Sequence, residues 1–161
     1  MPIHLRAASL QDLRALHALD RACFPAGIAY SRAEMEYFLS HPRTIGLIAE
    51  DEEGHLAGFI LAESAPRHRM AHIITIDIHA DSRRRGVGRV LMETVESRLK
   101  AASAEAIRLE VAVDNDVAQR FYASLGYEVR GRIRGYYLGK LDALVMEKAL
   151  DLAAPETEQE K

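Results

Sequence analysis

The chain has 161 residues, of which 48% are hydrophobic and 28% are charged, and its formal net charge is −3. This length suits one domain with a core of its own. The mild acidity argues against a general nucleic-acid-binding module, which needs a strongly basic surface. A single cysteine excludes an intrachain disulfide, and no apolar run approaches the roughly 20 residues of a membrane span. We therefore expect a cytoplasmic protein that binds neither membranes nor nucleic acid.

The chain begins with the pattern of one strand followed by two helices. Residues 3–7 alternate apolar and polar side chains, as a half-buried strand does. Ser9 and Ser31 each precede an acidic residue three positions on, which is the pattern of a capped helix start. The first helix is expected to end at Phe24-Pro25, because proline cannot continue it.

The middle of the chain predicts three strands and a long helix. Two apolar runs, 44–50 and 56–64, flank an acidic turn with a glycine and predict a hairpin. A third run rich in β-branched residues, 70–78, predicts another strand and leads into a basic turn. A helical period of apolar residues then extends from 86 to about 102.

The last third predicts strand, helix and two strands. Residues 106–113 read as a strand, and a helix follows that should end at Gly126. Residues 127–133 and 141–149 read as two strands joined through a glycine-containing connection.

This order of elements predicts an α/β (α+β) domain. Consecutive strands, followed by helices interleaved with strands, favour a mixed central sheet of about seven strands flanked by helices. The domain should span residues 1–150. The polar tail, residues 151–161, is expected to be disordered.

The most informative stretch is the basic turn between the strand at 70–78 and the long helix. Such a turn presents unpaired N–H groups, at the positive end of a helix dipole, to an anion. Its two glycines lack the Cβ atoms that would keep a phosphate from the backbone, and its arginines add charge-assisted donors. The residues are Arg83, Arg84, Arg85, Gly86, Val87, Gly88 and Arg89. The turn matches neither a P-loop nor a dinucleotide fingerprint, so it predicts either a phosphate cradle or a helix start with a solvated basic patch.

In this order of elements, the turn resembles the signature of the GNAT superfamily of acyl-CoA-dependent N-acetyltransferases. That signature is Gln/Arg-x-x-Gly-x-Gly/Ala, matched at Arg83, Gly86 and Gly88. Residues 70–149 also resemble the branch of ribosomal-protein-alanine (RimI-type) and other N-terminal acetyltransferases. The matching pieces are Leu109-Glu110-Val111, Asp114-Asn115, Phe121-Tyr122-x-x-x-Gly126-Tyr127, Tyr136-Tyr137 and Asp142-Ala143-Leu144-Val145-Met146. Residues 1–65 match mainly in pattern.

The resemblance implies a GNAT-like sheet, acetyl-CoA as acyl donor and no metal. In the family, the amides of this turn hold the pyrophosphate of coenzyme A, which would be the role of residues 83–89. Two splayed parallel strands hold the pantetheine, which assigns Ile76, Asp77 and Ile78 to it, with the Ile78 N–H facing the thioester carbonyl. Asn115 lies where family members bind coenzyme A, and its alternative role is a helix cap.

Three side chains are candidates for the proton transfers. Acetylation of an N-terminal amine needs a base, because the ammonium has a pKa of about 7.7–8.0. It also needs a proton for the leaving thiolate. By resemblance, Tyr122 would be the general acid, and its alternative role is that of a core aromatic. Glu110 would be the base, and its alternative role is that of a solvent-facing acid. His72 lies where related enzymes carry a tyrosine that works through water. Its alternative is a strand histidine with a structural partner.

The acceptor is the least defined part of the resemblance. Tyr136 and Tyr137 match paired tyrosines that line the peptide entrance, and Phe24, Pro25 and Tyr30 could form the opposite wall. The chain departs from its branch directly afterwards, because Leu138-Gly139-Lys140-Leu141 replaces the start of an acidic run. A protein or peptide N-terminus is the expected acceptor, in a monomer or homodimer. The alternatives are a small-molecule amine, a lysine side chain, or a non-catalytic acyl-CoA-binding domain.

Overall fold

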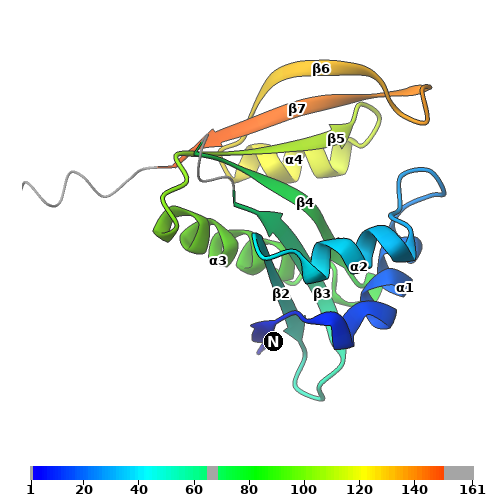
Figure 1. The fold of residues 1–161 in the computed structure, drawn as a ribbon, viewed down its shortest axis with the longest axis vertical. Helices are drawn as coiled ribbons and strands as arrows, with labels where there is room; N and C mark the ends of the chain where they lie inside the picture. The colour runs from blue at the N-terminus through cyan, green and yellow to red at the C-terminus, as the bar shows by residue number, and fades with distance from the viewer. Residues whose placement is uncertain (1, 65–68, 151–161) are drawn as a thin grey trace, which may run out of the picture.

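A computed structural model describes residues 2–64 and 69–150 of the chain. Its central feature is a seven-stranded sheet with helices on both faces (Figure 1). The strands are β1 (His4–Ala7), β2 (Thr44–Glu50), β3 (Leu56–Glu63), β4 (Met70–Ile78), β5 (Ala106–Ala112), β6 (Glu128–Tyr137) and β7 (Leu141–Ala149). They lie in the order β1-β2-β3-β4-β5-β7-β6. In the described residues, β4 and β5 pair in parallel, and every other pair of neighbouring strands is antiparallel.

The helices alternate with the strands in the predicted order, which confirms the α/β class with a mixed sheet. They are α1 (Leu13–Cys23), α2 (Arg32–Ser40), α3 (Val87–Ala101) and α4 (Asp116–Ser124), with short 3₁₀ turns η1 (Leu10–Asp12) and η2 (Ala80–Ser82). Both expected helix starts form reciprocal capping boxes, Ser9 with Asp12 and Ser31 with Glu34. In residues 2–64 and 69–150, no helix has the length and hydropathy to cross a membrane. The tail expected at 151–161 lies outside the described residues.

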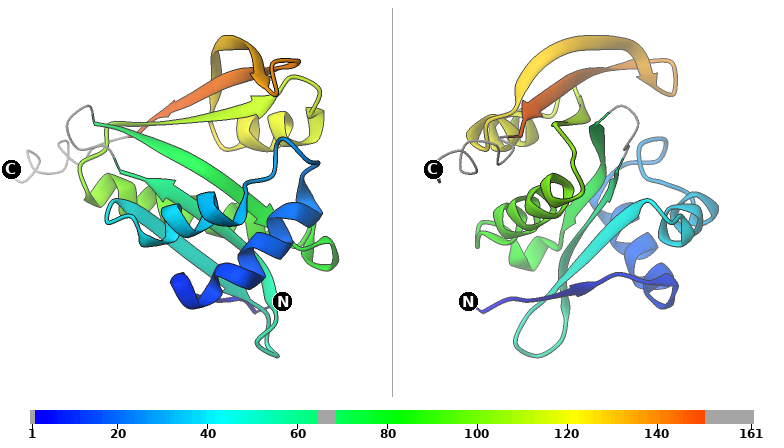
Figure 2. Two further views of the ribbon diagram at one scale, coloured as in Figure 1. Left: turned by 45° about the vertical axis from the view of Figure 1, so that its right-hand side comes forward. Right: turned by 60° about the vertical axis from the view of Figure 1, so that its left-hand side comes forward.

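The helices divide between the two faces of the sheet (Figure 2). The helices α1 and α2 cover one face of β2, β3 and β4, and α3 covers the opposite face. Leu16 of α1 and Met35 of α2 are fully buried against Phe59 of β3. Leu91 and Leu99 of α3 are buried in a second cluster that extends to α4. The site described below lies between these two clusters, where the sheet opens.

Strands β4 and β5 pair only at their first residues. The parallel ladder joins 70–72 to 106–108, and the strands then separate (Figure 1). A bulge in β4 accompanies the separation: Leu61 of β3 opposes Thr75, whereas the next residue, Ala62, opposes Ile73. One residue of β4, Ile74, is therefore extra, and such a bulge bends and twists its strand.

The bulge also changes which side chains of β4 face which helix. Before it, Ala71 and Ile73 pack into the cluster beside α3. After it, Ile76 and Ile78 pack against that same cluster. Because side chains alternate along a strand, Asp77 then faces the opposite side, toward α1.

Strand β6 extends beyond its expected end at residue 133. It continues to Tyr137, so the prediction that Gly135 lies in a connection between strands was wrong. Gly135 has a φ of +62° and lies at a register shift within the strand. Its N–H donates to Asp142 Oδ1 at 2.8 Å. The glycine therefore forms an irregularity inside the strand, and Tyr136 and Tyr137 belong to β6 itself.

Candidate active site

A cleft of about 1120 Å³ opens where β4 and β5 separate. It extends from the turn before α3 to the end of β6, with α1, the segment after it and α4 completing its walls. The predicted site residues that line it are Phe24, Pro25, Tyr30, Ile76, Asp77, Ile78, Arg83, Arg84, Gly86, Val87, Gly88, Arg89, Glu110, Asn115, Tyr122, Tyr136 and Tyr137. His72 and Arg85 are not among the lining residues, and His72 contacts the cleft through Glu110.

The turn before α3 has a backbone shape suited to an anion. Gly86 is the N-cap of α3 with a φ of +81°, and Arg84 has a φ of +64°. A Cβ on Gly86 would meet nothing within 4 Å, so the space beside it is open. A Cβ on Gly88 would lie 3.1 Å from Cζ of Phe121, so the start of α3 packs closely on α4. Unpaired N–H groups at a helix N-terminus, next to residues of positive φ, fit the pyrophosphate of coenzyme A.

Arg83 connects this turn to the end of β4. Its Nε donates to the Ile78 carbonyl oxygen at 3.1 Å, and its Nη2 lies 3.7 Å from Sγ of Cys23. The thiol of Cys23 lies 3.6 Å from the same carbonyl. Burial, and then the charge of Asp77, raises the pKa of this thiol. Cys23 therefore remains a protonated thiol at neutral pH, in a half-buried position.

The backbone of β4 turns hydrogen-bonding groups toward the cleft. The N–H of His79 donates to the Ala57 carbonyl of β3 at 2.8 Å. In an antiparallel pair, every second residue of a strand directs its backbone N–H and C=O toward the neighbouring strand. Asp77, two residues before His79, therefore also points its backbone groups toward β3, whereas Ile76 and Ile78 point theirs away from β3. On that side β5 has already separated from β4. The edge exposed there can pair with the amide groups of a pantetheine arm.

Glu110 and His72 form a close pair where the two strands part. Glu110 Oε1 lies 2.7 Å from His72 Nε2, and the exposed fractions of the two side chains are 10% and 29%. Arg108 Nε lies 3.5 Å from the other carboxylate oxygen, Oε2. Burial acts to raise the pKa of Glu110, but His72, Arg108 and Tyr136 outweigh it, and the pKa is lowered. Glu110 is therefore ionised at neutral pH and faces away from its buried neighbours in the strand.

Tyr122 lies on α4 beside the cleft and is 9% exposed. Its ring contacts those of Phe121 and Tyr127, with centroids 5.4 and 6.0 Å apart. Burial, followed by the charges of Asp77 and Tyr137, raises the pKa of its hydroxyl. Tyr122 thus combines a place in the core with a protonated hydroxyl at the cleft.

Asn115 is a helix cap. Its Oδ1 accepts a hydrogen bond from the Ala118 N–H at 3.1 Å, which satisfies one free donor at the start of α4. The residue also lines the cleft. Its amide nitrogen remains a donor that can reach a ligand there.

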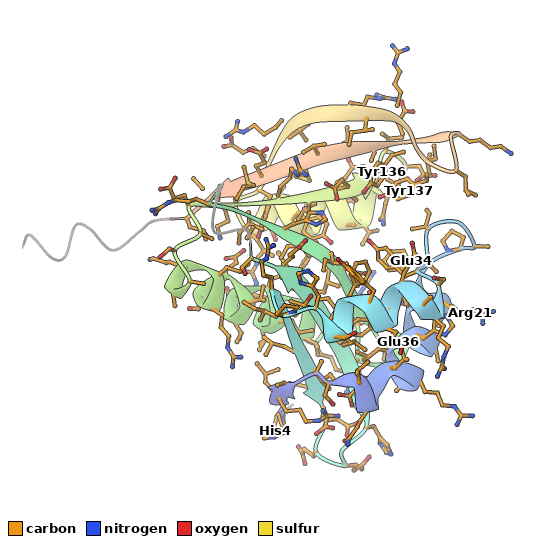
Figure 3. All side chains as sticks on the ribbon, viewed as in Figure 1. His4, Arg21, Glu34, Glu36, Tyr136 and Tyr137 are labelled. Atoms are coloured by element: carbon orange, nitrogen blue, oxygen red, sulfur yellow. The ribbon has the colours of Figure 1, made fainter. Side chains whose placement is uncertain are left out.

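Two tyrosine-bearing segments flank the cleft on the side of Glu110. Tyr136 and Tyr137 contact each other edge to face, with centroids 4.9 Å apart, and in the view of Figure 3 they lie between the β6–β7 hairpin and Glu34 of α2. Tyr30, from the segment between α1 and α2, donates its hydroxyl to the Ile74 carbonyl at 3.3 Å. Burial is the main cause that raises the pKa of each tyrosine, to about 12 for Tyr137. All three phenols are therefore neutral hydrogen-bonding groups near pH 7.

These two segments touch each other at Gly27 and Leu138. A Cβ on Gly27 would lie 2.2 Å from Cδ1 of Leu138, so glycine is what lets the leucine pack there. Both residues have positive φ, +93° for Gly27 and +56° for Leu138. Leu138 is nevertheless 70% exposed. A solvent-exposed leucine therefore joins the two walls of the cleft.

The sequence analysis did not single out Asp20, which is fully buried on α1. Its Oδ2 accepts a hydrogen bond from the Tyr30 N–H at 2.7 Å. A signal was available, because Leu13, Leu16 and Asp20 have the spacing of one helix face. An aspartate on the apolar face of a helix requires a buried partner.

Comparisons with known proteins agree with this geometry. A model of the acetyltransferase (GNAT) family matches residues 13–127. The uncharacterized N-acetyltransferase MJ1530 of Methanocaldococcus jannaschii is 31% identical over 145 residues, which cover 89% of this chain and 90% of that protein. NAA10 of Arabidopsis thaliana, the catalytic subunit of the N-terminal acetyltransferase A complex, is 29% identical over 154 residues, covering 91% and 77%.

Solved structures share the fold. The ribosomal-protein-S18-alanine N-acetyltransferase of Escherichia coli superposes with a TM-score of 0.84. The similarity covers 95% of this chain and 97% of that one, at 22% identity. At this identity the similarity concerns the fold alone.

Proposed function

The chain belongs to the acetyltransferase (GNAT) family and is an acetyl-CoA-dependent N-acetyltransferase, and we propose that its acceptor is the N-terminal α-amine of a protein or peptide. The observation that carries the proposal is the Glu110–His72 pair. It lies between the glycine turn that suits the coenzyme and the tyrosines that suit a peptide. The relative NAA10, named for N-terminal acetylation, supports this acceptor. A protein N-terminus also agrees with the expected cytoplasmic location.

Acetyl-CoA supplies the acetyl group as a thioester, and the glycine-turn end of the cleft suits it. Gly86 leaves the N–H groups at the start of α3 open to a pyrophosphate, and Gly88 lets this start of the helix pack closely on Phe121. Arg83, Arg84 and Arg89 line the cleft there. The proposed coenzyme contacts are Ile76, Asp77, Ile78, Arg83, Arg84, Arg85, Gly86, Val87, Gly88, Arg89, Asn115 and Tyr122. Asp77 belongs to this set only as part of its segment, because its side chain faces α1.

Glu110 and His72 accept the proton of the acceptor amine as a unit. An N-terminal ammonium has a pKa of about 7.7–8.0, so it must lose a proton before its nitrogen bonds to the acetyl carbon. The lowered pKa of Glu110 keeps its carboxylate ionised. At 2.7 Å, the carboxylate and the imidazole are within hydrogen-bonding distance, so a proton taken from the amine can be held between them.

Tyr122 and the Ile78 N–H act on the thioester. As the nitrogen–carbon bond forms and the carbon–sulfur bond breaks, the Ile78 N–H stabilises charge on the carbonyl oxygen. Tyr122 is the acid toward the sulfur, and its raised pKa keeps the hydroxyl protonated for this role. A thiol has a pKa of roughly 8.5, below that of Tyr122. Tyr122 therefore stabilises the leaving thiolate mainly by donating a hydrogen bond to it, and complete transfer of the phenol proton is less favourable.

The acceptor binds between the two tyrosine-bearing segments. Phe24, Pro25 and Tyr30 form one wall, and Tyr136 and Tyr137 form the other. The two walls are joined by the contact between Gly27 and Leu138. The peptide's first backbone groups can bond to the neutral phenols.

A screen for coenzyme A release tests this function. Peptides with free N-termini should be turned over, whereas the same peptides with a blocked N-terminus and a free lysine, or polyamines, should react at least about a hundredfold more slowly. Mass spectrometry would place the acetyl group on the first residue. Equal rates with blocked, lysine-containing peptides would overturn the proposed acceptor and leave the family reaction intact.

A further inference from the structure

Two aspartates are buried together beneath the acceptor side of the cleft. Asp20 of α1 is 0% exposed and Asp77 of β4 is 1% exposed. The bulge at Ile74 is what turns Asp77 toward α1, and the two carboxyl groups face each other at hydrogen-bonding range. Asp20 Oδ2 accepts from the Tyr30 N–H, and Asp77 Oδ1 accepts from Thr75 Oγ1 at 2.6 Å. Each aspartate therefore uses one oxygen to bond its own surroundings.

The second oxygen of each aspartate has no donor if both groups are ionised. Asp20 Oδ1 and Asp77 Oδ2 are both buried, and neither has a hydrogen-bond partner among the described residues. Two adjacent carboxylates buried without a donor would carry a large desolvation and repulsion cost. One proton between the two free oxygens satisfies both of them and leaves the pair with a single negative charge.

We propose that Asp20 and Asp77 share a proton, and that this pair is a positioning device that holds the segment between α1 and α2 against β4. Asp20 connects the two partners, because one of its oxygens accepts from the Tyr30 backbone and the other from protonated Asp77. Tyr30 in turn bonds to the Ile74 carbonyl. The wall formed by Phe24, Pro25 and Tyr30 is thus attached to β4 beside Ile76 and Ile78. The link to the acceptor rests on the proposed function; the shared proton does not.

The groups around the pair are consistent with a neutral Asp77. The Cys23 thiol of α1 lies near Asp77, and the Tyr30 phenol lies near Asp20 while it donates to the Ile74 carbonyl. Tyr122 approaches from α4. A thiol and two phenols carry no positive charge in either protonation state, so none of the three is a cation that could compensate an ionised pair. The nearby cation, Arg83, bonds to Cys23 and to the Ile78 carbonyl. Burial and Asp20 accordingly raise the pKa of Asp77 far above its usual range.

The pH dependence of folding stability tests the shared proton without any activity assay. The folded pair keeps a proton that the unfolded chain loses above about pH 4, so the contribution of this pair to folding stability falls as the pH rises. Asp77→Asn retains a donor to Asp20 and needs no proton. Between about pH 5 and pH 7, the unfolding equilibrium constant of wild type relative to this variant should rise up to about tenfold per pH unit.

The matched control is Asp81→Asn, at an aspartate whose side chain is 91% exposed. Its stability curve should run parallel to that of wild type. Curves for Asp77→Asn that also run parallel to wild type would overturn the shared proton. They would show that Asp77 is an ordinary ionised aspartate.

Two substitutions at Asp20 test the positioning role. Asp20→Asn still accepts from the Tyr30 N–H and donates to Asp77, whereas Asp20→Ala does neither. Hydrogen exchange of the Tyr30 amide should be about tenfold faster or more in Asp20→Ala and near wild type in Asp20→Asn. The KM for the acceptor peptide should rise by a similar factor in Asp20→Ala alone, with the KM for acetyl-CoA changed less. Equal exchange in wild type and both variants would overturn the positioning role. If wild type acetylates no peptide, the acceptor proposal fails, and the exchange result still decides the attachment.

Discussion

Glu110 Oε1 lies 2.7 Å from His72 Nε2, and the two residues come from strands that separate at this point. The last paired residues of β4 and β5 are His72 and Arg108, so Glu110 is two residues beyond the ladder. The contact therefore holds the strands together by side chains where their backbone pairing ends. It also places an ionised carboxylate in the lining of the cleft, with the imidazole in contact with it.

Substitution of His72 should change the titration of Glu110. His72 supplies the main interactions that lower the pKa of Glu110 against the opposing effect of burial. In His72→Phe only Arg108 and Tyr136 still lower it against the effect of burial, so the pKa should rise. NMR titration of the labelled Glu110 carboxyl group measures this directly. Arg108→Gln, which removes a smaller cause, should give a smaller rise; an unchanged pKa in His72→Phe would contradict the coupling.

The same pair predicts a sign for acid stability. A carboxyl group whose pKa is lower in the folded protein stabilises it above its usual pKa and loses that contribution as the pH falls. Glu110→Gln should therefore cost stability near pH 7 and little near about pH 3. Urea unfolding at both pH values checks this. A constant difference would mean that Glu110 acts through packing alone.

Replacement of the Tyr122 hydroxyl should separate chemistry from binding. Tyr122→Phe keeps the ring in its contacts with Phe121 and Tyr127 and removes only the donor. Turnover should fall by about 10²–10⁴-fold, while coenzyme A affinity by calorimetry changes little. Tyr127→Phe is the matched control, because its hydroxyl bonds to Glu96 and not to the cleft. Single-turnover rates equal to wild type would remove Tyr122 from the reaction.

The elements that sequence predicted well are those specified locally. Capping boxes at Ser9 and Ser31, and the glycine after α4, set helix ends through neighbouring residues. Gly135 had the local signal of a turn but lies inside β6, because pairing with β7 continues beyond it. The buried pair of Asp20 and Asp77 depends on a bulge and on contacts 57 positions apart in the chain, for which one sequence carries no local pattern.

The glycine turn should fail in two different ways when a side chain is added. Gly88→Ala would place a Cβ 3.1 Å from the Phe121 ring and push the start of α3 from α4. Gly86→Val meets no protein atom, but it strains a φ of +81° and fills the space proposed for the pyrophosphate. Calorimetry should show that Gly86→Val weakens coenzyme A binding at least about tenfold. Gly54→Val, at another exposed glycine of positive φ, should leave it unchanged.

A buried cluster on the other side of the sheet should control stability. Glu96 of α3 accepts from the Tyr127 hydroxyl at 2.8 Å and from Lys148 Nζ at 2.9 Å. These two contacts join α3 to β7 and to the residue before β6. The strands β5, β6 and β7 otherwise connect to the rest of the sheet only through the short β4–β5 ladder of the described residues. Glu96→Ala should lower the unfolding free energy by about 2–4 kcal/mol, because it leaves the partners unpaired. Glu93→Ala, at an exposed position of α3, should cost less than about 0.5 kcal/mol.

The contact between Leu138 and Gly27 should govern the acceptor and not the coenzyme. Leu138→Ala removes the side chain that joins the two walls and leaves both backbones free to keep their positive φ values. The acceptor walls would then separate more easily, so the KM for a peptide should rise severalfold while the KM for acetyl-CoA stays the same. Val117→Ala is the control, since Val117 is 73% exposed at the coenzyme end of the cleft. If blocked peptides with a free lysine become better substrates of Leu138→Ala, the joined walls exclude side-chain amines. If neither KM nor selectivity changes, the contact has no part in acceptor choice.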